Sequence, residues 1–191
     1  MSSDLERLRD LLSKTEKNIK IIEAVNGNFA LAVLNEWRYS TWHVMSACLD
    51  DTGNKDEQMA RAERHLRRSY FDSCDLLLDC LLDRVGVWRH GISGYEAVVT
   101  SVFPQYGAVI DAARTAQMAS IEVSSYTSDN RVSKYTCLES AIASMQIALE
   151  QICDAEPIVR SAIRKAKIKT AWQFIIGIAT ITGVLIAILR S

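Results

Sequence analysis

Apolar residues recur along most of this chain at spacings of three and four, which place them on one face of an α-helix. The first such series is Leu5, Leu8, Leu12, Thr15, Ile19 and Ile22. It forms a heptad seam of about three repeats, which would either pack inside a helical bundle or pair with a neighbouring subunit. Ser3-Asp4-Leu5-Glu6 fits a capping box at its start, and Asn26-Gly27-Asn28 is expected to break or bend the helix.

Two longer helices are predicted next. One runs from about Phe29 to Leu49, and its large aromatic side chains, Trp37, Tyr39 and Trp42, are expected in the core. Residues 50–54, DDTGN, have the composition of a loop. The other helix runs from about Lys55 to Val85, with a buried stripe formed by Leu66, Tyr70, Cys74, Leu77 and Leu81.

Glycine and proline mark the predicted boundaries in the second half. Gly86, Gly91 and Gly94 should surround a loop that contains Trp88, Arg89 and His90. A fourth helix should start near Tyr95 or Pro104 and end near Ser124, and residues 128–130 should separate it from a fifth helix over residues 131–155. Pro157 should then start or kink the last helix. With no sign of paired strands, the pattern predicts an all-α fold, a helical bundle.

The last apolar stretch, residues 171–189, contains no charged residue and reads AWQFIIGIATITGVLIAIL. As a helix it would be roughly 28 Å long at about 1.5 Å per residue, close to the ~30 Å of a bilayer core. Trp172 would lie at the headgroup level. We therefore predict a single C-terminal transmembrane helix, with a buried helix of a soluble protein as the alternative. A signal peptide is not expected, because the N-terminus, MSSDLERLRD, is polar and charged.

Charge fixes the predicted orientation of this segment. Residues 1–157 carry 16 basic and 23 acidic side chains, whereas residues 158–191 carry six basic ones and no acid. Five of those six cations precede the span and only Arg190 follows it, so the positive-inside rule predicts a cytoplasmic body. The predicted organisation is a helical bundle over 1–156, a basic amphipathic connector over 157–170 and a membrane helix over 171–189, in a single-pass, tail-anchored protein.

Small residues in the predicted span suggest close helix packing. Ala179, Gly183 and Ala187 recur every four residues, with Gly177, Thr180 and Thr182 nearby. Small residues let membrane helices approach closely, and Thr can donate a hydrogen bond across the contact. The segment is either a passive anchor or a self-associating helix, with or without a pore, and a pore would need about four or more copies.

Composition excludes several other classes. The near-zero net charge of −1 argues against a strongly basic nucleic-acid coat, and eight Gly with two Pro are too few for a sandwich or barrel. The five cysteines are an odd number without a CxxC motif, so neither a disulfide framework nor a metal site is indicated, and a reducing compartment fits. No cofactor is predicted.

Catalytic motifs are scarce. The sequence contains no phosphate-binding Gly-rich motif, HExxH, GxSxG or paired-carboxylate signature, so we do not expect an enzyme. One alternative is a membrane-tethered ribonuclease, because Arg84 and His90 fit the loose Arg-x4–6-His spacing of the HEPN type. There, His would act as general base and Arg would stabilise phosphate charge. Gly86 between them should weaken the required helix.

An arginine-rich segment, RAERHLRRSYFDSCD, is the candidate ligand site. Arg61, Arg64 and Arg68 should share the face opposite Leu66, and Asp72, Asp75, Asp79 and Asp83 should continue that outer face. This order opposes the helix dipole. Neighbouring helices therefore supply counter-charges, or the arginines bind an anion through bidentate contacts. Aromatic side chains nearby could stack on bases. The candidate nucleotide-binding residues are Arg61, Arg64, Arg67, Arg68, Tyr70, Arg89 and His90.

With a helical body, the RAERHLRRSYFDSCD helix and a C-terminal span, the chain resembles small membrane effectors of bacterial anti-phage systems. It is most similar in organisation to the Hailong-type effector. The resemblance implies an oligomeric ion channel (a tetramer or similar) in the bacterial inner membrane, gated by an oligonucleotide or single-stranded DNA made by a partner nucleotidyltransferase. The alternative is a tail-anchored adaptor or cell-death regulator without pore activity, although the Asn-Trp-Gly-Arg motif of one such family is missing.

Overall fold

The computed structural model describes the backbone of residues 2–27, 30–49, 53–124 and 131–190, and the side chains of 5–27, 30–49, 53–122 and 135–182. These ranges contain helices and no strand, which confirms the all-α prediction. The helices are α1 (Ser2–Asn26), α2 (Leu31–Leu49), α3 (Lys55–Gly91), α4 (Glu96–Val102), α5 (Tyr106–Ser124) and α6 (Arg131–Arg190).

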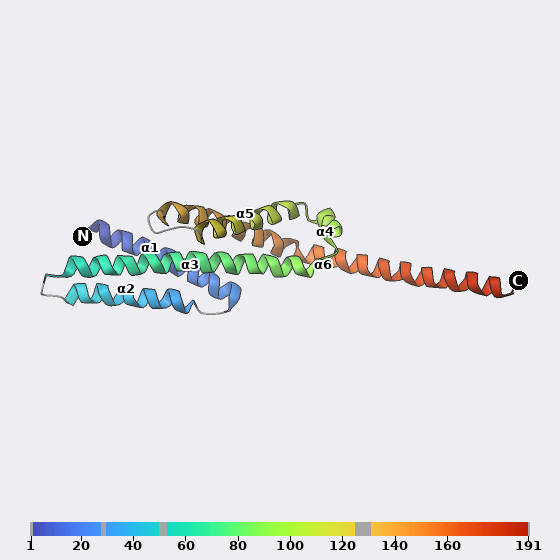
Figure 1. Cartoon of the computed structure of the whole chain (residues 1–191), viewed down its shortest axis with the longest axis horizontal. Helices are drawn as coiled ribbons and strands as arrows, with labels where there is room; N and C mark the ends of the chain where they lie inside the picture. The colour runs from blue at the N-terminus through green and yellow to red at the C-terminus, as the bar shows by residue number, and fades with distance from the viewer. Residues whose placement is uncertain (1, 28–29, 50–52, 125–130, 191) are drawn as a thin grey trace.

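Helix α3 is the centre of the bundle. It contacts α1 and α2, which come before it in the chain, and α5 and α6, which come after it (Figure 1). The short helix α4 packs against α5 and α6. Beyond the bundle, the C-terminal part of α6 projects alone and carries the C-terminus away from the other helices (Figure 1). The fold is therefore a bundle with one long, isolated helical arm.

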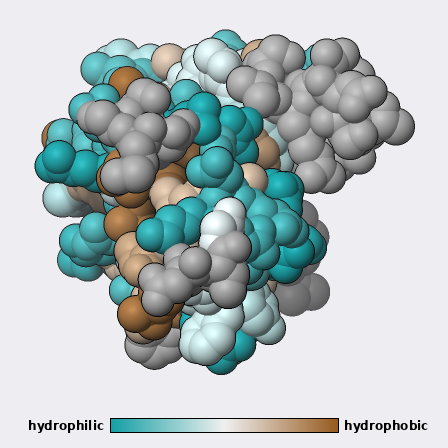
Figure 2. Space-filling model, turned by 90° about the vertical axis from the view of Figure 1, so that its left-hand side faces the viewer, coloured by the Kyte–Doolittle hydropathy of each residue, from teal (hydrophilic) through white to brown (hydrophobic). Residues whose placement is uncertain are grey.

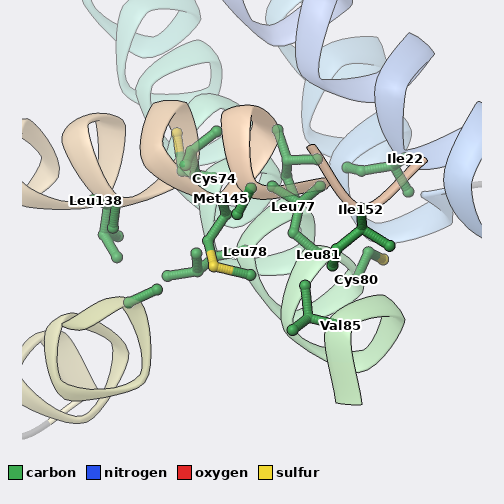
Figure 3. Close-up of a cluster of buried hydrophobic side chains, with 14 of the residues drawn as sticks. Ile22, Cys74, Leu77, Leu78, Cys80, Leu81, Val85, Leu138, Met145 and Ile152 are labelled. Carbon is green, nitrogen blue, oxygen red and sulfur yellow. The ribbon is translucent and has the colours of Figure 1, made fainter. Parts of the chain in front are cut away.

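The core forms where α1, α3 and α6 meet. Leu77, Leu78 and Leu81 of α3 are at most 1% exposed and lie beside Met145 of α6 and Ile22 of α1 (Figure 3). The predicted stripe from Leu66 to Leu81 is buried throughout, which confirms it. Burial of such side chains supplies most of the stability of a helical bundle.

The predicted seam of α1 is only partly correct. Leu8, Thr15, Ile19 and Ile22 are buried within the bundle, and the hydroxyl of Thr15 donates to the Leu11 carbonyl (2.8 Å). By contrast, Leu5 and Leu12 remain exposed. Helix α1 ends at Asn26, and Gly27 adopts a left-handed φ of 69°, which favours glycine. The side chains of the predicted capping box at residues 3 and 4, like Asn28, lie outside the described ones.

The expectation that Tyr39 and Trp42 are core residues is wrong. They are 45% and 65% exposed, whereas Trp37 is half-buried against the core. The inward face of α2 is instead built from small residues, Val33, Ser40 and Ala47. This lets α2 lie close to α3: the Ser40 hydroxyl donates to the Ala62 carbonyl and the Ser69 hydroxyl to the Val33 carbonyl, both at 2.9 Å. The large side chains then face outward.

The predicted loop around Trp88, Arg89 and His90 is also wrong, because α3 continues to Gly91. Gly86 costs a helix roughly 1 kcal/mol, but Val85 is 2% exposed and Trp88 packs against the core, so tertiary contacts hold the helix together. The turn comes later, where Gly94 has a φ of 81°. Earlier in the chain, Gly53 (φ 87°) belongs to the predicted loop before α3, whose residues 50–52 lie outside the described ones.

The predicted fourth helix starts near Pro104, the second of its two expected starts, and a separate short helix precedes it. Helix α4 ends at Val102 and α5 starts at Tyr106, because Pro104 disfavours helical backbone in the residue before it. The predicted separator at residues 128–130 lies outside the described ranges. Helix α6 has 60 residues and contains Pro157, so this proline does not start a new helix. The body, connector and predicted span therefore share one helix.

The part of the chain with described side chains, which ends in α6 at Thr182, contains no helical stretch long and apolar enough to cross a membrane. The transmembrane helix over residues 171–189 thus stays a prediction.

Candidate functional site

The structure divides the predicted ligand-binding residues into two groups along α3. Arg61, Arg64, Arg67, Arg68 and Tyr70 lie in its N-terminal half, and Arg89 and His90 lie in its last turn. At about 1.5 Å per residue, Arg68 and Arg89 are roughly 30 Å apart along the helix. One small ligand cannot reach both groups, so they do not form a single site.

Two arginines of the first group are neutralised within the chain. Arg61 pairs with Glu57 (2.5 Å) on the preceding turn of α3. Arg67 pairs with Glu63 (2.6 Å), and Glu63 also binds Arg7 of α1 at 2.6 Å. Glu63 is 19% exposed, so this three-residue cluster joins α1 to α3 at a partly shielded position. These contacts support a structural role for Arg61 and Arg67.

Arg64 and Arg68 are the two arginines of the first group that remain open to a ligand. Within the described ranges, no ion pair engages Arg64. Arg68 is 68% exposed, and its contacts with described carboxylates are long, 3.6 Å to Glu36 of α2 and 3.9 Å to Asp72. With Arg67, both line a surface pocket of about 520 Å³, whose other lining residues are Phe71, Asp72, Asp75 and Tyr135.

Tyr70 does not belong to this open surface. It is 6% exposed, and its hydroxyl donates a hydrogen bond to the Glu139 carboxylate of α6. Burial, together with this hydrogen bond, raises the pKa of the Tyr70 hydroxyl above its usual value. The ring is therefore a packing element and cannot stack on a base, contrary to the prediction. Phe71 is likewise stacked, with its ring 3.6 Å from that of Tyr135.

Residues far away in the sequence complete this region. Lys14 of α1 lies 3.9 Å from Glu139 and 5.9 Å from the centroid of the Tyr70 ring. Tyr135 and Glu139 come from the first turns of α6 that have described side chains. Helical spacing within one segment could not identify them, because they meet α3 only through the tertiary fold.

The second group lies in a different electrostatic environment. Arg89 lines a pocket of about 990 Å³ between α3 and α5, together with Asp79, Asp83 and Arg114. Two carboxylates and two guanidinium groups leave that lining without net charge. Burial and the neighbouring Asp83 carboxylate raise the pKa of Asp79. His90 is exposed at the end of α3. The pocket beside Arg89 therefore has no excess of positive charge to attract an anion.

The Arg84 and His90 pair lies on one continuous helix, as the ribonuclease alternative requires. Both residues lie on α3, where six positions correspond to a rotation of about 240°. Arg84 faces a pocket between α3 and α6, and His90 is not among the residues that line it. The helix that Gly86 was expected to weaken does form, but it directs the two side chains to different faces.

The small-residue face of the predicted span can be examined up to Thr182. Trp172, Gly177, Ala179, Thr180 and Thr182 are all exposed. The hydroxyls of Thr180 and Thr182 donate to the carbonyls of Ile176 (2.8 Å) and Ile178 (2.9 Å). Two positions of a helix differ by about 200°, so these threonines face nearly opposite directions and cannot both face one neighbour. The side chains of residues 183–190, Ala187 included, lie outside the described ones.

The described residues contain no cluster of three or more His, Cys, Asp or Glu that could hold a metal ion. All five cysteines are free; Cys74 and Cys80 are buried, and Cys48, Cys137 and Cys153 are exposed. Burial raises the pKa of the Cys74 thiol to about 11. The buried thiols are therefore inert small hydrophobic side chains.

Comparisons with family models, with curated proteins and with solved structures find no match for this chain.

Proposed function

We propose that this protein is a membrane effector of bacterial anti-phage defence. Several copies associate, and their helices over residues 171–189 form an ion channel or a membrane-disrupting pore in the inner membrane, under the control of an anionic nucleotide or single-stranded DNA ligand. The observation that carries the proposal is the continuity of α6. Its residue Val159 is 1% exposed in the core, and the same helix continues without a loop into the uncharged segment.

The exposed side chains of that arm support its insertion into lipid. Trp172, Phe174, Ile175, Ile176, Ile178 and Ile181 are each between 51% and 70% exposed. Exposed apolar surface of this extent is unfavourable in water and marks an interaction with lipid or with other protein. Since five cations precede residue 171, the positive-inside rule places the bundle in the cytoplasm.

An exposed apolar face on α2 supports association with further copies. Leu31, Trp42, Met45 and Leu49 are between 53% and 78% exposed and lie within about 60° of one another around the helix. Figure 2 looks at the end of the molecule where α2 ends and shows hydrophobic residues exposed among hydrophilic ones (Figure 2). We assign this surface, the α2 face, to a second copy, because one membrane helix cannot line a pore.

Arg64 and Arg68 support recognition of an anionic ligand. They are the arginines of the first group whose charges are least compensated, and they border one pocket. A ligand made by a partner nucleotidyltransferase would present several phosphates, each of which a guanidinium can bind through two hydrogen bonds. Asp72 and Asp75 in the same pocket would disfavour a closely spaced polyanion, so the contacts should be few and specific.

The experiment is a potassium-flux assay with the full chain in liposomes, with and without a short single-stranded DNA. The parent protein should conduct, and DNA should change the flux. Replacing Arg64 and Arg68 with Glu should abolish the response to DNA. Replacing Lys17 and Lys55 with Glu, the same charge change on other surfaces, should preserve it. An equal response in all three proteins would contradict the assigned ligand surface.

The tail-anchored adaptor is the second candidate, because an exposed α2 face also suits a different protein partner. It predicts insertion without any flux. The membrane-tethered ribonuclease is the third candidate, supported by the spacing of Arg84 and His90 on α3.

A further inference from the structure

A second cationic pocket lies between the C-terminal part of α3 and the middle of α6. Its volume is about 720 Å³, within the size range of small-molecule sites. Arg84 of α3 and Arg160, Arg164 and Lys167 of α6 line it together with one carboxylate, Glu156. The net charge of the lining is therefore +3, on a bundle whose first 157 residues carry seven more acids than bases.

The three cations that α6 contributes lie on one face of the helix. Four positions separate Arg160 from Arg164 and three separate Arg164 from Lys167, so the three side chains lie within about 60° of one another. Glu156 neutralises Arg160 at 2.5 Å. Among the described residues, no ion pair engages Arg164 or Lys167, and the ammonium of Lys167 lies 5.4 Å from the centroid of the Tyr95 ring. Two uncompensated cations in line along a helix suit a ligand that carries more than one phosphate.

The apolar part of the pocket lies on the side of these cations that is farther from the arm. Ile152 and Val159 of α6 line it and are at most 4% exposed. Trp88 of α3 borders it and is held edge-to-face against Phe103, with ring centroids 6.2 Å apart. A free phosphate or polyphosphate would use the cations and leave this floor uncovered. A ligand that joins phosphates to a flat aromatic group would use both, because nucleic-acid bases stack favourably on aromatic side chains.

The position of the floor requires a water-soluble ligand. Val159 and Ile152 precede residue 171 by about 18 and 28 Å along α6, so the floor faces the aqueous phase even if residues 171–189 span a bilayer. Figure 1 shows α6 continuing past the end of α3 in this region, and Arg164 and Lys167 are exposed there (Figure 1). The cationic end of the pocket is therefore open to a ligand from solution.

The spacing of the charges along α6 identifies the ligand class. Arg164 and Lys167 lie about 8 and 12 Å beyond Val159 toward the arm, which matches a base, a sugar and a chain of phosphates laid along the helix. We propose that the pocket binds a nucleoside polyphosphate, with its base on the Trp88 floor and its outer phosphates at Arg164 and Lys167. This site is separate from the surface of Arg64 and Arg68, because Arg68 precedes Arg84 by about 24 Å along α3. It also requires no membrane insertion, so it goes beyond the proposed function.

The first test compares three ligands of the full chain in mild detergent by isothermal titration calorimetry without divalent cations. ATP should bind roughly tenfold more tightly than tripolyphosphate, which has no base to stack on the floor. ATP should also bind roughly tenfold more tightly than AMP, whose single phosphate cannot contact both cations. Trp88→Ala should remove the advantage of ATP over tripolyphosphate and leave tripolyphosphate binding unchanged. Equal binding of ATP and tripolyphosphate by the parent, or an advantage of ATP that survives in Trp88→Ala, would overturn the assignment of the base.

The second test concerns the cations. Replacing Arg164 and Lys167 with Gln removes charge-assisted hydrogen bonds and should weaken ATP binding roughly tenfold or more. The matched control replaces Lys165 and Lys169 with Gln. These residues lie on the same helix and carry the same charge but do not line the pocket, so this variant should bind ATP like the parent. An equal loss in both double variants would overturn the pocket in favour of general surface attraction.

A third variant separates this site from the proposed function. Replacing Arg64 and Arg68 with Glu should leave ATP binding unchanged, and a loss of ATP binding in that variant would overturn the assignment of ATP to the pocket between α3 and α6. A parent protein that shows no flux in liposomes but binds ATP through Arg164 and Lys167 would refute the proposed function and support this site.

Discussion

Trp37 and Trp42 offer a matched test of which surfaces hold the copies together. Both are tryptophans of α2, five positions apart. Trp37 packs against the core, whereas Trp42 is 65% exposed on the α2 face. Replacing each with Ala removes the same atoms from opposite environments. We expect Trp37→Ala to destabilise the fold and Trp42→Ala to destabilise only the association of copies.

The magnitudes follow from burial. An aromatic side chain buries up to about 250 Å², and covering the exposed two-thirds of Trp42 at about 25 cal/mol per Å² gives an upper bound of roughly 4 kcal/mol. Truncating a tryptophan at the centre of an interface weakens the binding free energy by about 2–4 kcal/mol, which corresponds to association about 30- to 1,000-fold weaker. Because Trp37 is partly buried, Trp37→Ala should lower the free energy of unfolding by about 2–3 kcal/mol. For a chain of this size that lowers the melting temperature by roughly 5–10 °C.

The assay combines light scattering during size-exclusion chromatography in mild detergent with thermal unfolding followed by circular dichroism. Trp42→Ala should dissociate at concentrations where the parent is oligomeric and should melt within about 2 °C of it. Trp37→Ala should melt lower. If Trp42→Ala keeps the parent's mass at every concentration, the α2 face is not the interface between copies.

Three further predictions concern the bundle itself. Pro157→Ala should raise the melting temperature, because proline in a helix interior costs up to about 3 kcal/mol and Pro157 is exposed. An unchanged or lower melting temperature would show that the proline does not destabilise α6. Iodoacetamide at pH 8 should label the exposed thiols of Cys48, Cys137 and Cys153 but not Cys74, whose pKa of about 11 keeps it protonated; peptide mass mapping that finds rapid labelling of Cys74 in the folded protein would contradict its burial. Leu77→Ala should lower the free energy of unfolding by about 3 kcal/mol, because Leu77 is 0% exposed. Leu5→Ala, the same deletion at 48% exposure, should lower it by less than half as much. Equal losses of melting temperature in the two variants would refute the assigned core.

Helical periodicity was sufficient to predict the all-α fold and the buried face of α3. It was insufficient at Gly86, where contacts of Val85 and Trp88 outweigh the propensity of a single glycine. It also failed on α2, because hydrophobicity alone favours burying Trp42 rather than Ser40. The decisive factor there is close helix packing through small residues and the hydrogen bond from Ser40 to Ala62, which depend on α3.

The candidate ligand surface was predictable only as a cluster of arginines. The two compensated arginines pair with acids one turn away on α3, Arg61 with Glu57 and Arg67 with Glu63, a spacing already visible in the sequence. The long contact of Arg68 with Glu36 of α2, by contrast, depends on the tertiary fold. Likewise, the role of Tyr70 depends on Glu139, 69 positions away. The pocket between α3 and α6 could not be foreseen, because Arg84 and Arg164 are 80 residues apart.

The central claim is that α6 connects the bundle to a conducting membrane helix, and its two threonines allow a direct test. Thr180 shares a face with Gly177, whereas Thr182 faces nearly the opposite direction. Single-channel currents should be recorded from the full chain, from Thr180→Leu and from Thr182→Leu in planar bilayers. We predict discrete conductance steps for the parent and for Thr182→Leu, and none for Thr180→Leu at equal insertion. An inserted parent protein that never produces a conductance step, or equal currents from all three proteins, would contradict the account.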